Sequence, residues 1–183
     1  ITFTFPHVGI VGINKLDNES NKIHASGCII NQPLGIKSNW RCEKDLSFFF
    51  TKNNIACISN IDTRQITRLL ATKGAIKSAI VNFGKNFDSM KIIKEEIKKW
   101  HGLKNLDLAK IVSTNNNYNL TEGNWSSDKN NYVINSNKKK YKIACLDFGI
   151  KKNILRNLYS NNFDSTVLNA NSTFEKIMST HPD

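Results

Sequence analysis

The pattern of apolar and polar positions changes its period within the stretch from Lys142 to Asn157. The run Ile143–Leu146 is apolar at every position, which is typical of a strand buried on both faces in a parallel sheet. From Ile150 onward, apolar residues recur at helical intervals instead. This stretch therefore predicts a buried strand, a turn at 147–149 and a helix that begins near Ile150.

A second strand and helix follow, predicted at Ser165–Leu168 and Ser172–Ser179. In open α/β sheets, ligands bind outside the carboxyl ends of the strands. Asp147 and Lys151 fall at such a strand end, so the turn is a candidate ligand site. A second interpretation stays open, in which Asp147 caps the helix and the neighbouring lysines are solvated.

The first 140 residues alternate between short strands and helices. Strands are predicted at Ile1–Phe5, Ile23–Ile30, Ile55–Ile58 and Ala79–Val81. Helices are predicted at Leu46–Lys52, from Asp62 to Gly74, and from Asp88 or Ser89 to Trp100. Leu106, Leu108 and Ile111 are expected to be apolar anchors, and residues 115–119 a polar loop. This mixture indicates the α/β class.

Three residues have the chemistry of helix ends. Asp45 is placed to cap the first helix, and Asp62 has capping-box spacing with Gln65 in the second. Gly74 is placed to end the second helix in a left-handed conformation.

The composition is that of an ordinary globular chain, with 183 residues of which 39% are hydrophobic. No apolar run approaches the ~20 residues that a membrane helix needs, and residues 1–14 lack the basic start of a signal peptide. We therefore expect a cytoplasmic protein without membrane contact. The chain begins inside a predicted strand and ends abruptly, so we also expect a fragment of a longer protein.

The net charge of +11, from 26 basic and 15 acidic residues, raises the question of nucleic-acid binding. Only four of the basic residues are arginine, and the abundant Asn, Ile and Lys all have codons rich in A and T. Genomic base composition accounts for this set without a ligand. The lysines are scattered, and no basic strand interleaved with aromatic residues is present. We therefore expect no nucleic acid as a partner.

The four cysteines are Cys28, Cys42, Cys57 and Cys145. None forms a CxxC pair, and His24 near Cys28 is not backed by a second ligand pair, so no metal site is expected. Cys57 and Cys145 lie in apolar runs, where inert thiols are common. None lies in a Gly-x-Cys-x-Gly turn, which a nucleophile elbow would need.

Several motifs follow one another along the chain. They are Phe5-Pro6-His7-Val8-Gly9, Ser38-Asn39-Trp40-Arg41, Ile61-Asp62-Thr63-Arg64, Lys73-Gly74-Ala75, Gly123-Asn124-Trp125 and the stretch from Asp147 to Arg156. Through this ordered series the chain resembles the small, glutamine-hydrolysing subunit of carbamoyl phosphate synthase, a class I glutamine amidotransferase. A single motif would be a weak signal, whereas the series extends from one end of the chain to the other.

The resemblance implies two domains. Residues 1–128 correspond to the β/β/α-type N-terminal domain of the small subunit, whose first strands would lie before Ile1. Residues 129–140, rich in Ser, Asn, Asp and Lys, form a linker. Residues 141–183 correspond to the truncated start of a flavodoxin-like class I glutamine amidotransferase domain. We expect this short segment to be poorly stable and residues 1–128 to contain more core.

The resemblance also implies a function. Members of this family release ammonia from L-glutamine with a Cys–His–Glu triad. A large subunit then uses this ammonia, ATP and bicarbonate to make carbamoyl phosphate for arginine and pyrimidine biosynthesis. The triad would lie beyond Asp183, so these residues alone would be inactive, and no cofactor is expected in this chain. Lys151 matches a lysine beside the glutamine site of the family and is expected to support that site.

Two other interpretations stay open. The chain holds most of the family-specific domain and no nucleophile, so its role could be that of a non-catalytic docking module for the large subunit. The third interpretation is a basic nucleic-acid-binding protein, which would bind DNA with a steep salt dependence. Co-purification with a large subunit would favour the first two.

Overall fold

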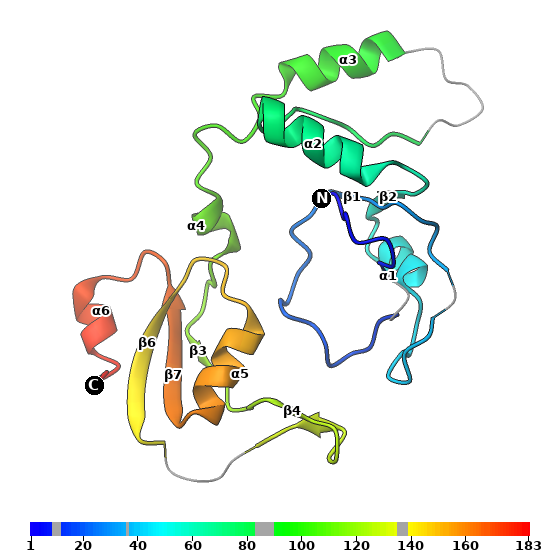
Figure 1. The fold of residues 1–183 in the computed structure, drawn as a ribbon. Coiled ribbons are helices and arrows are strands. Elements are labelled where there is room, and N and C mark those ends of the chain that lie inside the picture. Colours follow the sequence, from blue (N-terminus) through cyan, green and yellow to red (C-terminus); the bar gives the residue numbers. More distant parts are fainter. Residues whose placement is uncertain (9–11, 36, 83–89, 135–138) are drawn as a thin grey trace. The chain divides into compact units, whose positions relative to one another are not determined.

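The computed structural model describes residues 1–8, 12–35, 37–82, 90–134 and 139–183. The chain forms two compact units (Figure 1). Unit 1 comprises Ile1–Asp17 and His24–Asn105, and unit 2 comprises Asn18–Ile23 and Leu106–Asp183. Each unit combines helices with small sheets, which confirms the predicted α/β class. Within the described ranges, no helix is long and apolar enough to cross a membrane.

A small parallel sheet forms the centre of unit 1. Strand β1, Gly27–Ile29, pairs with β2, Ala56–Ile58, and places Cys28 opposite Cys57. Cys28 and Ile30 are buried there. The strand predicted at the start of the chain is wrong, because only Thr2 bridges to β1. The strand predicted at residues 79–81 is also wrong, since this segment is irregular.

Three helices complete unit 1, and the first two follow the predicted caps. Asp45 accepts a hydrogen bond from the Phe48 N–H at the start of α1, Leu46–Lys52. Asp62 does the same for the Gln65 N–H in α2, Thr63–Lys73. Gly74 ends α2 with φ at 76°, where a residue without a side chain is favoured.

The third helix, α3, spans Met90–Lys99, and its predicted caps Asp88 and Ser89 lie outside the described residues. Its lysines are exposed as predicted, but Trp100, predicted to be buried, is 46% exposed. The helical pattern alone shows which residues share a face. It does not show how much of that face another element covers.

Unit 2 is built on a three-stranded sheet in the order β3, β7, β6. The central strand β7, Phe163–Asn169, pairs in parallel with β6, Tyr141–Asp147, and antiparallel with β3, Tyr118–Asn119. Helix α5, Lys152–Ser160, lies beside β7 (Figure 1). The helices α4, Leu108–Val112, and α6, Phe174–Met178, complete the unit.

Two sequence predictions for unit 2 need correction. Strand β6 is not buried on both faces, because Asp147 is its only buried residue and Leu146 is 37% exposed. At its outer edge, the Asp183 N–H donates a hydrogen bond to the Lys142 carbonyl oxygen, and the Lys142 N–H donates one to the Asp183 carboxylate. The polar loop predicted at residues 115–119 contains β3, because its main chain completes the sheet beside β7.

The buried side chains are also distributed differently from the prediction. The described residues of 141–183 bury four apolar or aromatic side chains, and those of 1–128 bury only Cys28 and Ile30. The four are Leu155, Tyr159, Val167 and Leu168. The predicted anchors Leu106, Leu108 and Ile111 are exposed. The larger core therefore lies where α5 covers β7.

The compact units and the predicted domains divide the chain at different places. Unit 2 includes residues 106–128, since β3 comes from this stretch. In the predicted linker, strand β5, Asn131–Tyr132, pairs with β4, Trp125–Ser126, and residues 135–138 lie outside the described residues. The domain limits at 128 and 141 stay a prediction.

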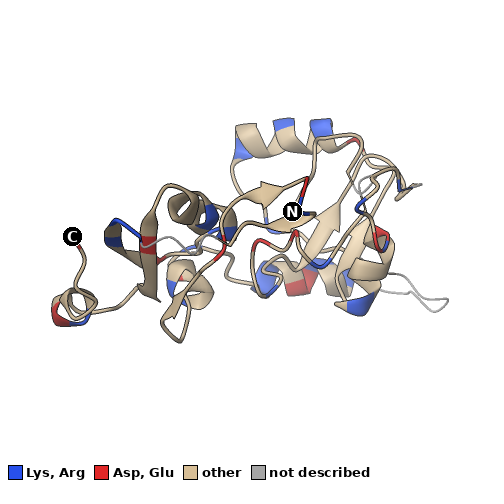
Figure 2. Ribbon diagram, turned by 90° about the horizontal axis from the view of Figure 1, so that it is seen from below, with Lys and Arg blue, Asp and Glu red and all other residues tan. Residues whose placement is uncertain are grey.

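The basic residues of the described part are spread over helices and loops, with acidic residues between them. Figure 2 shows this distribution on the ribbon. It agrees with the scattered lysines of the sequence.

Candidate functional site

The turn after β6 is organised by one buried carboxylate. Asp147 is 5% exposed, and its Oδ1 accepts hydrogen bonds from the N–H groups of Gly149 and Ile150, at 2.9 and 2.8 Å. Its Oδ2 accepts the Thr114 N–H at 2.7 Å. Carboxylates that accept several N–H bonds hold a turn firmly. Asp147 therefore has a structural role at the carboxyl end of β6.

Gly149 completes this turn. Its φ is 97°, and a Cβ atom added there would lie 3.0 Å from the Val112 side chain. Both the backbone conformation and the space therefore favour glycine. The turn passes directly into α5, which begins at Lys152 and not at Ile150 as predicted.

Lys151 is the N-cap residue of α5, and its side chain makes no cap hydrogen bond. The interpretation of Asp147 as the helix cap is wrong, because the N–H groups that it accepts, those of Thr114, Gly149 and Ile150, all lie outside α5. The carboxylate at the helix start belongs to Glu19: its Oε2 accepts the Asn153 N–H at 2.8 Å. Its Oε1 lies 3.7 Å from the Lys151 Nζ.

The two adjacent lysines differ in exposure. The side chain of Lys151 is 59% exposed, which leaves its ammonium group accessible beside the end of β6. Lys152 is partly buried, although solvation was expected for it. Its main-chain N–H donates to the Glu19 carbonyl oxygen at 3.1 Å. The structure thus places Lys151 at the sheet end where ligands bind in α/β folds, and its predicted role stays a prediction.

Sequence reasoning missed a second charged group on α5. Arg156 is 3% exposed, and its Nε and Nη2 donate to the Glu122 Oε1 at 2.9 and 2.7 Å. Its guanidinium lies 3.6 Å from the centre of the Tyr132 ring, in cation–π geometry. The only available signal was an arginine among apolar helix positions, and that pattern does not identify the partners.

Three of the four thiols have little nucleophilic character. Burial raises the pKa of Cys28 to about 11, and burial also raises the pKa values of Cys57 and Cys145. They are therefore protonated at neutral pH, whereas the thiolate is the reactive form. The described part of the chain contains no group of three or more His, Cys, Asp or Glu residues that could hold a metal ion.

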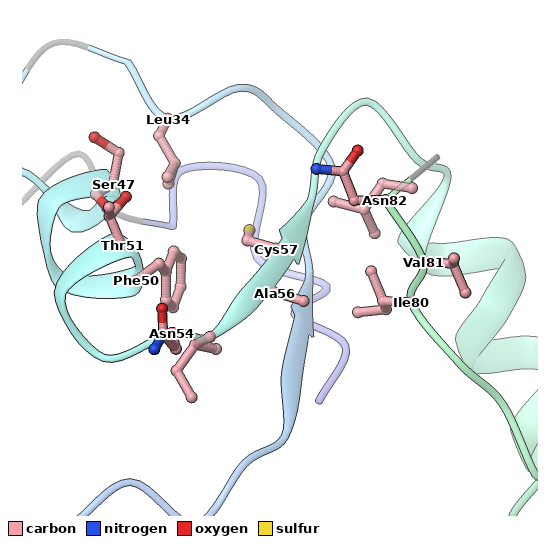
Figure 3. Close-up of a pocket in the computed structure, with 12 residues that line it drawn as sticks. Leu34, Ser47, Phe50, Thr51, Asn54, Ala56, Cys57, Ile80, Val81 and Asn82 are labelled. Atoms are coloured by element: carbon pink, nitrogen blue, oxygen red, sulfur yellow. The ribbon is translucent and has the colours of Figure 1, made fainter. Parts of the chain in front are cut away.

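A cavity of about 700 Å³ lies in unit 1. Figure 3 shows residues of α1 on one side of β2 and residues 80–82 on the other. Phe50, Ile80 and Cys57 contribute apolar or weakly polar surface, and Ser47, Thr51, Asn54 and Asn82 contribute uncharged polar groups. None of its described lining residues is charged. Their chemistry suits an apolar group, and among them there is no set for acid–base or nucleophilic catalysis.

Comparison with known proteins shows similarity along the whole chain and not only at the turn after β6. A family model described as "Carbamoyl-phosphate synthase small chain, CPSase domain" matches residues 1–80. The small chain of carbamoyl phosphate synthase from Zymomonas mobilis is 37% identical over the whole chain, which corresponds to 49% of that protein. The small chain from Salmonella typhimurium is 39% identical, again over the whole chain and 48% of that protein.

A Buchnera aphidicola small chain is also 39% identical over the whole chain and 47% of its own length. The fold by itself defines a chain of the α/β class. Over its whole length the chain is similar to curated carbamoyl phosphate synthase small chains, and residues 1–80 match the family model of that subunit. It spans about half the length of the curated relatives it matches.

Proposed function

We propose that this chain is part of the small subunit of a glutamine-dependent carbamoyl phosphate synthase. In this proposal the whole protein hydrolyses L-glutamine and supplies the ammonia to a large subunit. The large subunit consumes ATP and bicarbonate, and this chain needs no cofactor of its own. The observation that carries the proposal is the match to carbamoyl phosphate synthase small chains over every residue of the chain.

Lys151 is proposed to support the glutamine site. Its position at the carboxyl end of a parallel strand and its accessible ammonium group support this role. A lysine ammonium donates charge-assisted hydrogen bonds to carboxylate or carbonyl oxygens. The nucleophilic cysteine is proposed to lie outside these residues, since none of the four cysteines has the required turn.

The test uses the intact small subunit together with its large subunit. Carbamoyl phosphate formation is measured with glutamine and, separately, with free ammonia. We expect ammonia to support synthesis by the large subunit alone, and glutamine to support it only when the small subunit is added. If glutamine supports no carbamoyl phosphate formation even when both subunits are present, the proposal is contradicted.

A docking role without catalysis is the second candidate. It is favoured by the exposed apolar side chains of α3 and of the residues that follow it, namely Met90, Ile92, Trp100 and Leu103. Replacement of Ile92 and Trp100 by serine is expected to weaken binding to the large subunit in this case. If binding persists and glutamine hydrolysis is intact, docking through this surface is excluded.

A further inference from the structure

The start of α5 is held by a residue from a distant part of the sequence. Glu19 precedes Asn153 by 134 residues. Its carboxylate accepts the Asn153 N–H at 2.8 Å, and its main-chain oxygen accepts the Lys152 N–H at 3.1 Å. The same carboxylate lies 3.7 Å from the Lys151 ammonium group. One glutamate therefore contacts three successive residues.

The local sequence explains why α5 needs such a partner. The first N–H groups of a helix have no partner within the helix. Serine, threonine, asparagine or aspartate usually supplies an oxygen at the N-cap, but lysine has no acceptor. Glu19 supplies the oxygen from outside, and its negative charge also suits the positive end of the helix dipole.

The segment around Glu19 is anchored in the same unit as α5. Residues Asn18–Ile23 belong to unit 2, although the residues on both sides of them belong to unit 1. Within this segment the Lys22 Nζ donates to the Ile111 carbonyl oxygen at 3.2 Å. The carboxylate is thus fixed both by its own segment and by the helix that it caps.

We propose that Glu19 is a positioning residue for Lys151. The hydrogen bond from Asn153 fixes the carboxylate, and the carboxylate then restrains the Lys151 ammonium group beside the carboxyl end of β6. This inference rests on the proposed function, in which Lys151 supports the glutamine site. The ion pair restrains an otherwise mobile lysine side chain, and the 59% exposure of that side chain keeps it accessible to a ligand.

A double-mutant cycle in the intact small subunit tests the proposal, with glutamine as substrate and glutamate release as the readout. Glu19→Gln keeps an oxygen for the Asn153 N–H but removes the charge that faces Lys151. We expect it to lower kcat/KM about two- to fivefold, the range for an exposed ion pair. In a Lys151→Ala background the same change should alter kcat/KM less than about 1.5-fold, because no ammonium group remains to be positioned.

Two controls separate positioning from damage to the fold. Asp17→Asn breaks another ion pair, 2.6 Å from Arg41, only two residues earlier in the sequence. It should leave kcat/KM unchanged. Amide hydrogen exchange at Asn153 should accelerate in Glu19→Ala, which lacks the acceptor oxygen, and should stay near the wild-type rate in Glu19→Gln.

The outcomes distinguish this inference from the proposed function. If Lys151→Ala lowers kcat/KM but Glu19→Gln has no effect, or has the same effect in both backgrounds, the positioning role is overturned and the role of Lys151 stands. If Lys151→Ala leaves kcat/KM unchanged, the proposed role of Lys151 fails, and the role of Glu19 fails with it. Faster exchange at Asn153 in Glu19→Gln would attribute its kinetic effect to a damaged cap and would also overturn the inference.

Discussion

Two adjacent lysines at the start of α5 offer a direct comparison at the scale of single residues. We expect Lys151→Ala in the intact protein to lower glutamine hydrolysis, measured as kcat/KM, by about 10- to 100-fold. This corresponds to the loss of a charge-assisted hydrogen bond at about 1.4 kcal/mol per decade. Lys152→Ala should change kcat/KM little, because the contact of Lys152 with Glu19 is made by its main chain. Equal losses at both positions would rule out this division of roles.

The buried thiol of Cys28 gives a prediction about pH. Burial raises its pKa from 9.0 to about 11, so the folded chain keeps the proton over a range in which the unfolded chain loses it. The folded state then binds more protons, and its stability falls as the pH rises from about 9 to about 11. The loss is at most about 3 kcal/mol, from two pKa units at about 1.4 kcal/mol each.

Urea unfolding at several pH values measures this loss. Cys28→Ala is the matched variant, since it retains every other group that titrates in this range. It should be less stable at pH 8 because of the cavity, but its stability should fall less steeply between pH 9 and 11. Parallel pH profiles for the two proteins would contradict the prediction.

Single residues were predictable from the sequence where their partners are local. Asp45 and Asp62 cap helices three residues ahead of them, and the spacing alone indicates such bonds. Glu19 was not predictable, because its contact with Asn153 spans 134 residues. The candidate site was therefore predicted in part: Lys151 was found at the strand end, and the carboxylate beside it was not.

At the scale of elements, Arg156 joins α5 to the hairpin formed by β4 and β5. Its guanidinium contacts both Glu122 and the Tyr132 ring, and the Asn124 N–H donates to the Ser160 hydroxyl oxygen on the same helix. We expect Arg156→Ala to lower the free energy of unfolding by about 2 kcal/mol, since it truncates a buried side chain that packs on Tyr132 and pairs with the partly exposed Glu122. Arg64→Ala, at an exposed position on α2, should change it by less than about 0.5 kcal/mol.

Urea denaturation of the intact protein measures both variants. Glu122→Gln adds a further comparison, because the glutamine oxygen can still accept from Arg156 while the charge is lost. It should destabilise the protein less than Arg156→Ala does. If Arg156→Ala is no more destabilising than Arg64→Ala, the contact with the hairpin contributes nothing to stability.

Helices and strands were predicted well where neighbouring residues determine them. They were predicted poorly where their environment depends on distant segments of a sheet. Helix α1 has the predicted bounds, because a cap and an apolar cluster define it within a few residues. Strand β6 was found but was assigned the wrong environment. Its apolar run predicts burial on both faces, yet Asp147 is its only buried residue, because burial depends on which distant segments pack on the strand.

For the whole molecule, the distribution of buried side chains predicts where the chain opens first. The described residues of β7 include the buried Ser165, Val167 and Leu168, and α5, which packs beside this strand, buries Leu155 and Tyr159. Helix α3 buries no side chain. Local opening is easiest where few apolar contacts must be broken. Amides of β7 should therefore exchange with solvent most slowly and those of α3 much faster, and the reverse order would show that burial does not govern opening here.

The last prediction concerns what these 183 residues can do alone. We expect the purified chain to release no ammonia from glutamine. Burial raises the pKa values of Cys28, Cys57 and Cys145, so these thiols are protonated, and hydrolysis through a thioester needs a thiolate. Cys42 has no elbow turn, and its thiol donates to the Lys44 carbonyl oxygen at 3.0 Å.

Ammonia release from glutamine by the purified chain measures this directly, with the intact small subunit as the positive control. Background release is distinguished from catalysis by changing all four cysteines to serine. Ammonia release that depends on any of these cysteines would show that a nucleophile does lie within these residues. The proposal that the catalytic cysteine lies outside the chain would then be wrong, whereas the similarity to carbamoyl phosphate synthase small chains would be unaffected.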